Sequence, residues 1–174
     1  RFLQPLGRAG GILVAALFIC RISMAAPLEV APPDIAAPAW ILIDHDSGQA
    51  LAEKNGDTPL PPASLTKLMT AYVLFGKLKS GMLAPDDSIS ISERAAQARG
   101  ARLFLRAGSA VRVEDLLKGM IAVSANDATI ALVEHTEKNE ANFVMQMNVA
   151  ARALELRQTT FVNAMGHDEK GQIS

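Results

Sequence analysis

Short apolar runs separated by turn residues open the folded part of the chain. Trp40 to Ile43 is apolar, Asp44 to Gly48 supplies turn formers, and Gln49 to Glu53 resumes a partly apolar run. Two short runs around such a turn predict a β-hairpin. Residues 55–63 then carry three prolines and an Asn-Gly-Asp sequence, which predicts irregular chain before the next element.

A first long helix is expected to begin at Ser64 and to end near Lys79. Ser64 follows the prolines and could accept hydrogen bonds from free backbone N–H groups, while Gly81 lies just beyond the far end. Apolar residues recur at the i, i+3, i+4, i+7 spacing of one helix face, and further apolar residues lie on other sides, so burial is expected over most of the circumference. The spaced residues are Leu65, Leu68, Met69 and Tyr72, and the others are Val73, Leu74 and Phe75.

Shorter elements and three more helices follow. Alternation over residues 88–92 predicts a minor strand, with one helical turn after it over residues 93–97. The helical patterns cover residues 113–123, 126–136 and 140–154. A short extended pair is predicted for residues 103–105 and 111–113, a further strand for residues 160–162, and a loop for residues 166–174.

Residues 1–25 have the pattern of a secretory signal peptide. Arg1 and Arg8 precede an apolar run of about ten residues, roughly half of what a helix needs to cross a bilayer, and small residues precede an expected cleavage after Ala25. The alternative is an uncleaved amphipathic or membrane anchor. Residues 26–38 are expected to form an extended lead-in, and the domain is expected over residues 39–174. Because the chain begins with Arg rather than Met, we expect it to be a fragment of an exported protein.

Charge and cysteine content exclude several classes of function. The chain has 17 Lys and Arg against 18 Asp and Glu, and removal of Arg1, Arg8 and Arg21 leaves 14 basic residues and a net charge of −4. Without a basic excess, a nucleic-acid partner is not expected. The only cysteine, Cys20, lies in the leader, so a disulfide, a Cys-ligated metal or a Cys nucleophile is not expected in the mature protein. The three histidines are isolated, so neither a metal nor a cofactor is expected.

The first candidate for chemistry is Ser64-Leu65-Thr66-Lys67. Residues three apart on a helix share a face, so the serine hydroxyl and the lysine amine would lie within hydrogen-bonding reach. A lysine can take the serine proton if its surroundings lower its pKa, and the helix N-terminus favours an anionic intermediate. The alternative is a helix cap followed by a solvated lysine.

The second candidate is Ser124-Ala125-Asn126, which lies between two predicted helices. A short loop there could point two polar side chains into a cleft, and the 60 residues from Ser64 to Ser124 allow the chain to leave and return. The alternative is a simple N-cap, because Ser, Asn and Asp all cap helices well.

These two motifs together resemble the serine penicillin-binding proteins and class A β-lactamases, which are defined by Ser-x-x-Lys, Ser-x-Asn and Lys-Thr-Gly. The wider sequences are more specifically similar to a low-molecular-mass D-alanyl-D-alanine carboxypeptidase. These are residues 62–71, residues 124–128 and the run Phe161-x-Asn163-x-x-Gly166-x-Asp168-x-x-Gly171-Gln172-x-Ser174. The resemblance covers roughly Trp40 to Ser174. It implies an α+β fold, with an antiparallel sheet, a mostly helical lobe and the serine between them, incomplete at the C-terminus.

The resemblance also implies a role for each motif residue. Ser64 would be the acylated nucleophile, with its backbone N–H forming half of the oxyanion hole, and Lys67 would be the general base. Ser124 would relay a proton to the leaving group, and Asn126 would bind the substrate's peptide. No Lys-Thr-Gly occurs in the 174 residues. His167 stands where relatives often carry leucine and is interpreted as structural or exposed.

The function that the resemblance implies is removal of the terminal D-alanine from peptidoglycan pentapeptides through an acyl-enzyme, in cell-wall biogenesis and the maintenance of cell shape. β-Lactams would be covalent inhibitors, and the location would be periplasmic, with attachment to the inner membrane through a later segment left open. A class A β-lactamase would carry a glutamate for deacylation some tens of residues after Ser-x-Asn. That class is disfavoured because no Glu occurs around residues 161–163. A D,D-endopeptidase of the same superfamily and a non-catalytic peptidoglycan-binding relative are the alternatives.

Overall fold

The computed structural model describes residues 31–32, 34–137, 139–167, 171 and 173–174. The predicted signal peptide and the first part of the lead-in lie outside the described residues. The chain divides into two compact units, Arg1–Glu53 and Lys54–Ser174, which are taken separately. Among the described residues, no helix combines the length and the apolar character that a membrane span needs.

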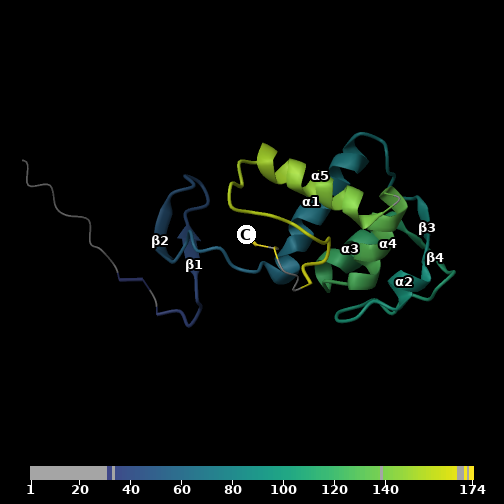
Figure 1. Ribbon diagram of the computed structural model, residues 1–174, viewed down its shortest axis with the longest axis horizontal. Coiled ribbons are helices and arrows are strands. Elements are labelled where there is room, and N and C mark those ends of the chain that lie inside the picture. The colour runs from purple at the N-terminus through teal and green to yellow at the C-terminus, as the bar shows by residue number, and fades with distance from the viewer. Residues whose placement is uncertain (1–30, 33, 138, 168–170, 172) are drawn as a thin grey trace, which may run out of the picture. The chain divides into compact units, whose positions relative to one another are not determined.

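The predicted hairpin is confirmed. Strands β1 (Trp40–Ile43) and β2 (Ala50–Lys54) pair in a two-stranded sheet (Figure 1). In the turn between them, Asp44 Oδ1 accepts hydrogen bonds from the backbone N and the hydroxyl of Ser47. The turn therefore forms for the reason that the sequence suggests, because a short Asx side chain replaces backbone partners.

The first helix begins two residues later than predicted. A 3₁₀ turn, η1 (Ala63–Leu65), leads into α1 (Thr66–Lys79), and no side chain caps either start. Ser64 thus lies in the 3₁₀ turn and does not cap the helix. The end at Lys79 agrees with the prediction, since Gly81 follows with a φ of 74°.

The buried face of α1 is not the one that the apolar spacing predicts. Leu65 and Leu68 are 69% and 64% exposed, and Tyr72 and Phe75 are also exposed. The helix instead packs through small and polar residues such as Thr66 and Thr70, together with Leu74, against α5 and α3. The prediction that Leu65, Leu68 and Tyr72 belong to the core is wrong, because hydroxyl groups with internal partners occupy the buried side.

A second small sheet joins β3 (Ser88–Ser90) to β4 (Ala110–Arg112), antiparallel and with Ile89 opposite Val111. Between them lies the one-turn helix α2 (Glu93–Ala96), capped by the hydroxyl of Ser92. The minor strand and the helical turn are confirmed. The predicted pairing of residues 103–105 with residues 111–113 is wrong, because β4 pairs with β3.

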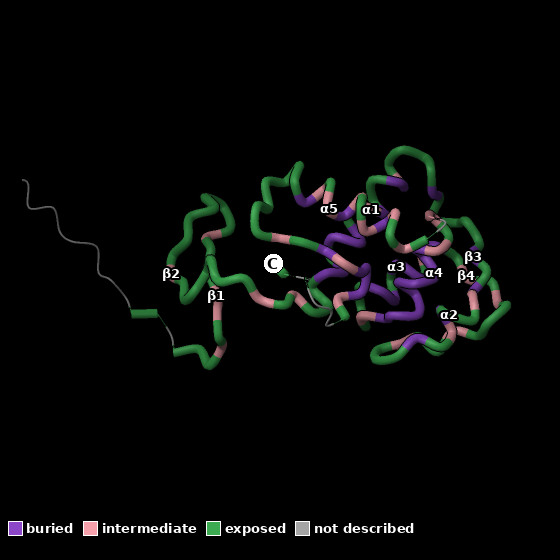
Figure 2. Tube along the Cα trace, in the orientation of Figure 1, coloured by how far each residue is buried: buried purple, intermediate pink, exposed green. Residues whose placement is uncertain are grey.

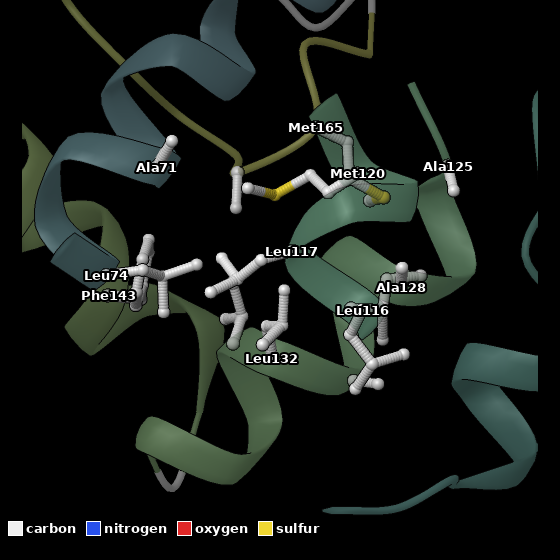
Figure 3. Close-up of a cluster of buried hydrophobic side chains, with 14 of the residues drawn as sticks. Ala71, Leu74, Leu116, Leu117, Met120, Ala125, Ala128, Leu132, Phe143 and Met165 are labelled. Carbon is white, nitrogen blue, oxygen red and sulfur yellow. The ribbon is translucent and has the colours of Figure 1, made fainter. Parts of the chain in front are cut away.

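Three helices build the core of the second unit. They are α3 (Val113–Ala122), α4 (Asn126–Thr136) and α5 (Glu140–Ala153), and each agrees with its predicted range to within one residue. Figure 1 shows α1 beside α5, and α3 packs on α4. Buried positions concentrate on these four helices (Figure 2). Their core includes Leu74, Leu116, Leu132 and Phe143, all fully buried (Figure 3).

Glu134, Glu137 and Glu140 are only partly exposed, and each is bound to a cation. Glu137 accepts a hydrogen bond from Lys77 at 2.7 Å. Glu134 and Glu140 both pair with Arg94. The basic residues of α1 and α2 therefore lie against the end of α4 and the start of α5.

The predicted strand at residues 160–162 is reduced to a single bridge between Thr160 and Ile173. Next to it, the backbones of Leu60 and Ser174 exchange two hydrogen bonds of 2.9 and 3.0 Å. The end of the described chain is therefore tied to the segment that leads into Ser64.

Candidate active site

Ser64 and Lys67 lie together at the start of α1. Lys67 Nζ is 3.3 Å from Ser64 Oγ. Ser64 is exposed, whereas Lys67 is only 4% exposed. The pair thus combines an accessible hydroxyl with an amine that is shielded from water, and the alternative of a solvated lysine does not hold.

Burial lowers the pKa of the Lys67 amine, because desolvation disfavours its charged form. Among the described contacts, no carboxylate bonds to this amine, and its second partner is the backbone carbonyl oxygen of Met165 at 3.0 Å. A lysine with a lowered pKa can be neutral in part of the population and can accept a proton from a neighbouring hydroxyl.

Ser124 reaches the same cavity from the loop between α3 and α4. The cavity has a volume of about 540 Å³ and lies within the second unit. Ser124 has a left-handed backbone with φ of 58°, a strained conformation that is common at functional sites. The structure therefore brings Ser64, Lys67 and Ser124 together. The lining residues are Pro62, Ala63, Ser64, Leu65, Lys67, Leu68, Met120, Ile121 and Ser124.

Asn126 lies beside this cavity and not in its lining. It is 7% exposed, and its Nδ2 donates to the carbonyl oxygen of Arg99 at 2.6 Å. Its backbone N donates to the carbonyl oxygen of Ala101 at 2.8 Å. In this arrangement Asn126 fixes the loop at residues 99–101. Binding of a substrate peptide by Asn126 stays a prediction.

The next residue, Asp127, holds the same loop further along. Its two carboxylate oxygens accept hydrogen bonds from the backbone N of Leu103 and of Leu105, at 3.0 and 3.1 Å. Phe104 between them has a φ of 60° and is 74% exposed. This is why residues 103–105 form no strand: a buried carboxylate, not a neighbouring strand, satisfies their N–H groups.

Sequence reasoning assigned no role to Asn163 or to the carbonyl of Met165. The turn from Asn163 to His167 packs on the start of α1, where Thr70 Oγ1 donates to the carbonyl oxygen of Ala164 at 2.7 Å. The signal was present in the sequence, since Asn163 and Gly166 belong to the run that resembles the family, but spacing alone does not show which backbone atoms such a turn presents.

No group of three His, Cys, Asp or Glu side chains with metal-binding geometry occurs in the part of the chain that the structure describes. The groups that line the cavity are the hydroxyl of Ser64, the amine of Lys67 and the hydroxyl of Ser124. Such a set suits nucleophilic acyl transfer.

The comparisons with known proteins agree with this class of site. A family profile described as D-alanyl-D-alanine carboxypeptidase matches residues 26–174. The chain therefore belongs to the D-alanyl-D-alanine carboxypeptidase family. The D-alanyl-D-alanine carboxypeptidase DacC of Escherichia coli K12 is 40% identical over 174 residues, which cover 97% of this chain and 43% of that protein.

Two further relatives bear on the fold and on the alternatives. The crystal structure of penicillin binding protein 5 from Haemophilus influenzae aligns with a TM-score of 0.79 at 40% identity, covering 83% of this chain and 43% of that one. This likeness confirms the predicted α+β fold. A D-alanyl-D-alanine endopeptidase from Pseudomonas aeruginosa is 31% identical over 155 residues, covering 83% of this chain and 49% of its own length. The chain thus spans less than half the length of these relatives.

Proposed function

We propose that the full-length protein is a serine D-alanyl-D-alanine carboxypeptidase that removes the terminal D-alanine from peptidoglycan pentapeptides. The observation that carries the proposal is the contact of 3.3 Å between the buried amine of Lys67 and the exposed hydroxyl of Ser64. A non-catalytic peptidoglycan-binding protein would have no need of an amine whose pKa is lowered beside a nucleophile.

The residues suggest one order of events. Lys67 takes the proton of Ser64, and Ser64 Oγ attacks the carbonyl carbon between the last two D-alanines. Ser124, on the same cavity, gives its proton to the amine of the departing D-alanine as the peptide bond breaks and takes the proton held by Lys67 in exchange. Water then attacks the ester on Ser64 and gives a proton to Lys67, and that proton returns to Ser64 Oγ as the ester bond breaks and the shortened peptide leaves.

Family membership and the relatives' names support peptidoglycan peptide stems as the substrate class and β-lactams as covalent inhibitors. The signal pattern of residues 1–25 supports export to the periplasm. A role in cell-wall biogenesis and cell shape would follow from this location and chemistry.

The second candidate is a D,D-endopeptidase. It is supported by the endopeptidase from Pseudomonas aeruginosa, whose 31% identity to this chain is lower than the 40% of DacC. Both activities would use Ser64 in the same way and differ in the group that leaves. Assays of the purified full-length protein on a pentapeptide and on a cross-linked muropeptide dimer separate the two activities. A carboxypeptidase releases free D-alanine from the pentapeptide, whereas an endopeptidase cleaves the dimer into monomers.

A covalent trap tests the proposal. Incubation of the full-length protein with benzylpenicillin is expected to add one penicilloyl group, which intact mass and peptide mapping would place on Ser64. The Ser64→Ala variant should show no adduct. An adduct on another residue, or an adduct that Ser64→Ala retains, would show that Ser64 is not the nucleophile.

A further inference from the structure

The amine of Lys67 is held on the side away from Ser64 by a backbone turn. Met165 O accepts a hydrogen bond from Lys67 Nζ at 3.0 Å. The residue before it in the turn, Ala164, is fixed to α1 by Thr70 and to α5 by Glu140, through bonds of 2.7 and 3.0 Å. The place of the amine therefore depends on the place of this turn.

One side chain shapes the turn. Asn163 Oδ1 accepts hydrogen bonds from the backbone N of Met165, Gly166 and His167, at 3.1, 2.7 and 3.2 Å. Asn163 Nδ2 donates to the carbonyl oxygen of His167 at 3.0 Å. Asn163 is 4% exposed, so its amide provides partners that water could not easily replace.

The turn also closes the space around Lys67. Gly166 has a φ of 82°, and a Cβ there would lie 1.7 Å from the carbonyl oxygen of Ala63, the residue before Ser64. The Met165 side chain joins the hydrophobic core together with Met120 (Figure 3). The backbone on this side is thus in van der Waals contact with the start of α1 and excludes water from the amine.

We propose that Asn163 is a positioning residue for Lys67: its amide folds residues 163–167 into the turn whose Met165 carbonyl aims the Lys67 amine at Ser64. This inference rests on the proposed function and adds a residue to it. Asn163 is not among the residues that line the cavity, and it acts through the backbone of the turn.

The physical reason is the directionality of a neutral amine. To accept the serine proton, the lone pair of Lys67 Nζ must point at Ser64 Oγ, and an N–H bonded to Met165 O fixes the rotation about the terminal bond. Without the turn, the amine would rotate and would gain water, and its protonated form would become more stable. A misplacement of about 1 Å can cost on the order of 10²-fold in rate.

The test measures the rate of acylation of the full-length protein by a fluorescent penicillin from pH 6 to pH 10, with CD to confirm folding. Asn163→Ala is expected to lower the rate about 10²-fold near neutral pH and to move the acid limb of the profile to higher pH. Asn163→Asp keeps an acceptor for the three N–H groups but loses the donor to the carbonyl oxygen of His167, so it should recover only part of the rate.

Asn148→Ala is the matched control. Asn148 also satisfies backbone groups with its amide, since it donates to and accepts from Phe161 at 2.8 and 2.9 Å, but none of its hydrogen bonds among the described residues reaches residues 163–167 or Lys67. It should acylate within about twofold of wild type when compared at equal folded fraction. If Asn163→Ala acylates like wild type, or if both alanine variants lose rate alike with an unmoved acid limb, the proposal is wrong.

A second readout separates this proposal from the proposed function. Modification of Lys67 by acetic anhydride, measured by peptide mapping against pH, reports the protonation and access of the amine without any β-lactam. In Asn163→Ala, acetic anhydride should modify Lys67 faster at high pH and the midpoint of the curve should move upward, whereas Asn148→Ala should follow wild type. An unchanged curve in Asn163→Ala overturns the positioning role. A wild type that shows no penicillin adduct overturns the proposed function instead.

Discussion

Asn126 Nδ2 lies 3.4 Å from His167 Nε2, on the same turn that holds Lys67. Because an amide nitrogen only donates, this contact is a hydrogen bond when Nε2 carries the lone pair and the imidazole proton is on Nδ1. The sequence suggested that His167 is structural or exposed, and the geometry supports a structural role. It also connects the Ser-x-Asn loop to the turn from Asn163 to His167.

Replacement of His167 by leucine should therefore weaken substrate binding more than catalysis. One neutral hydrogen bond contributes about 1 kcal/mol, so His167→Leu is expected to raise KM for a pentapeptide about fivefold and to leave kcat within about twofold. Steady-state release of D-alanine by the full-length protein measures both constants. His135→Leu, at the exposed end of α4, is the control. A fall in kcat of tenfold or more would show that His167 takes part in the chemistry.

The lowered pKa of Lys67 leads to a prediction of pH dependence. The acylation rate should rise with pH as the amine loses its proton, with a midpoint below 10.5, the ordinary value for lysine. Lys67→Arg keeps a cation of similar length that cannot give up its proton, so the rate should fall by at least about 10²-fold. Stopped-flow acylation with a chromogenic cephalosporin measures both effects. Acylation by Lys67→Arg within a few fold of wild type, with unchanged circular dichroism, would reduce Lys67 to an electrostatic neighbour.

The ion pair between Lys77 and Glu137 predicts a loss of stability at low pH. Hydrogen bonds from Lys77 and then Gln146 lower the pKa of the Glu137 carboxylate below 4.5. A carboxylate with a depressed folded-state pKa adds stability above its unfolded pKa, and this stability is lost as pH falls through the folded value. Glu137→Gln should cost about 2 kcal/mol in the free energy of unfolding at pH 7 and much less near pH 3.

Urea unfolding of Glu137→Gln, Lys77→Met and the double variant at both pH values isolates the pair. The coupling energy should be present at pH 7 and small at pH 3. Arg112→Met provides a comparison, because the pairs of Arg112 are exposed and should contribute little at either pH. Equal coupling at both pH values would contradict the assignment of the pH effect to Glu137.

The close approach of Gly166 to the carbonyl oxygen of Ala63 predicts that position 166 tolerates only glycine. In Gly166→Ala a methyl group would lie 1.7 Å from a carbonyl oxygen and would also carry the strain of a positive φ. Gly108 has a φ of 75° but nothing within 4 Å of its missing Cβ, so Gly108→Ala isolates the strain alone. We expect a loss of about 1 kcal/mol for Gly108→Ala and more than about 3 kcal/mol for Gly166→Ala, measured by chemical denaturation. Similar losses for the two variants would mean that the turn moves away from Ala63 easily.

The sequence predicted the helices because their signals are local. Asn126 and Glu140 begin α4 and α5 as expected, and Asn139 caps α5 through its side chain, whereas Ala125 precedes α4 without a side-chain cap. The pairing of β4 with β3 was missed because partner choice is nonlocal. The N–H groups of Leu103 and Leu105 could be satisfied by a strand or by a carboxylate, and only the folded chain shows that Asp127 provides the partner.

In the candidate site, too, local features could be predicted and long-range contacts could not. Ser64 and Lys67 could be paired from their spacing on one helical turn, and Ser124 from its place between two helices. Burial in the folded chain lowers the pKa of Lys67, and its backbone partner Met165 lies almost a hundred residues away, so no local pattern could indicate either. The exposed apolar face of α1 was also misassigned, since a hydrophobic spacing does not tell which part of a protein covers it.

Residues 26–174 alone are expected to show no measurable release of D-alanine, although Ser64, Lys67 and Ser124 line one cavity. The 174 residues contain no Lys-Thr-Gly, the motif to which the resemblance assigns the substrate carboxylate and the second half of the oxyanion hole. Loss of one oxyanion donor alone costs about 10²- to 10³-fold in rate.

The cavity wall also includes Leu65 and Leu68, which are 69% and 64% exposed and leave the site open to water. A D-alanine release assay on residues 26–174 beside the full-length protein tests this expectation, with Ser64→Ala of each as the blank. Turnover by residues 26–174 comparable to that of the full-length protein would show that the cavity formed by Ser64, Lys67 and Ser124 is sufficient for catalysis.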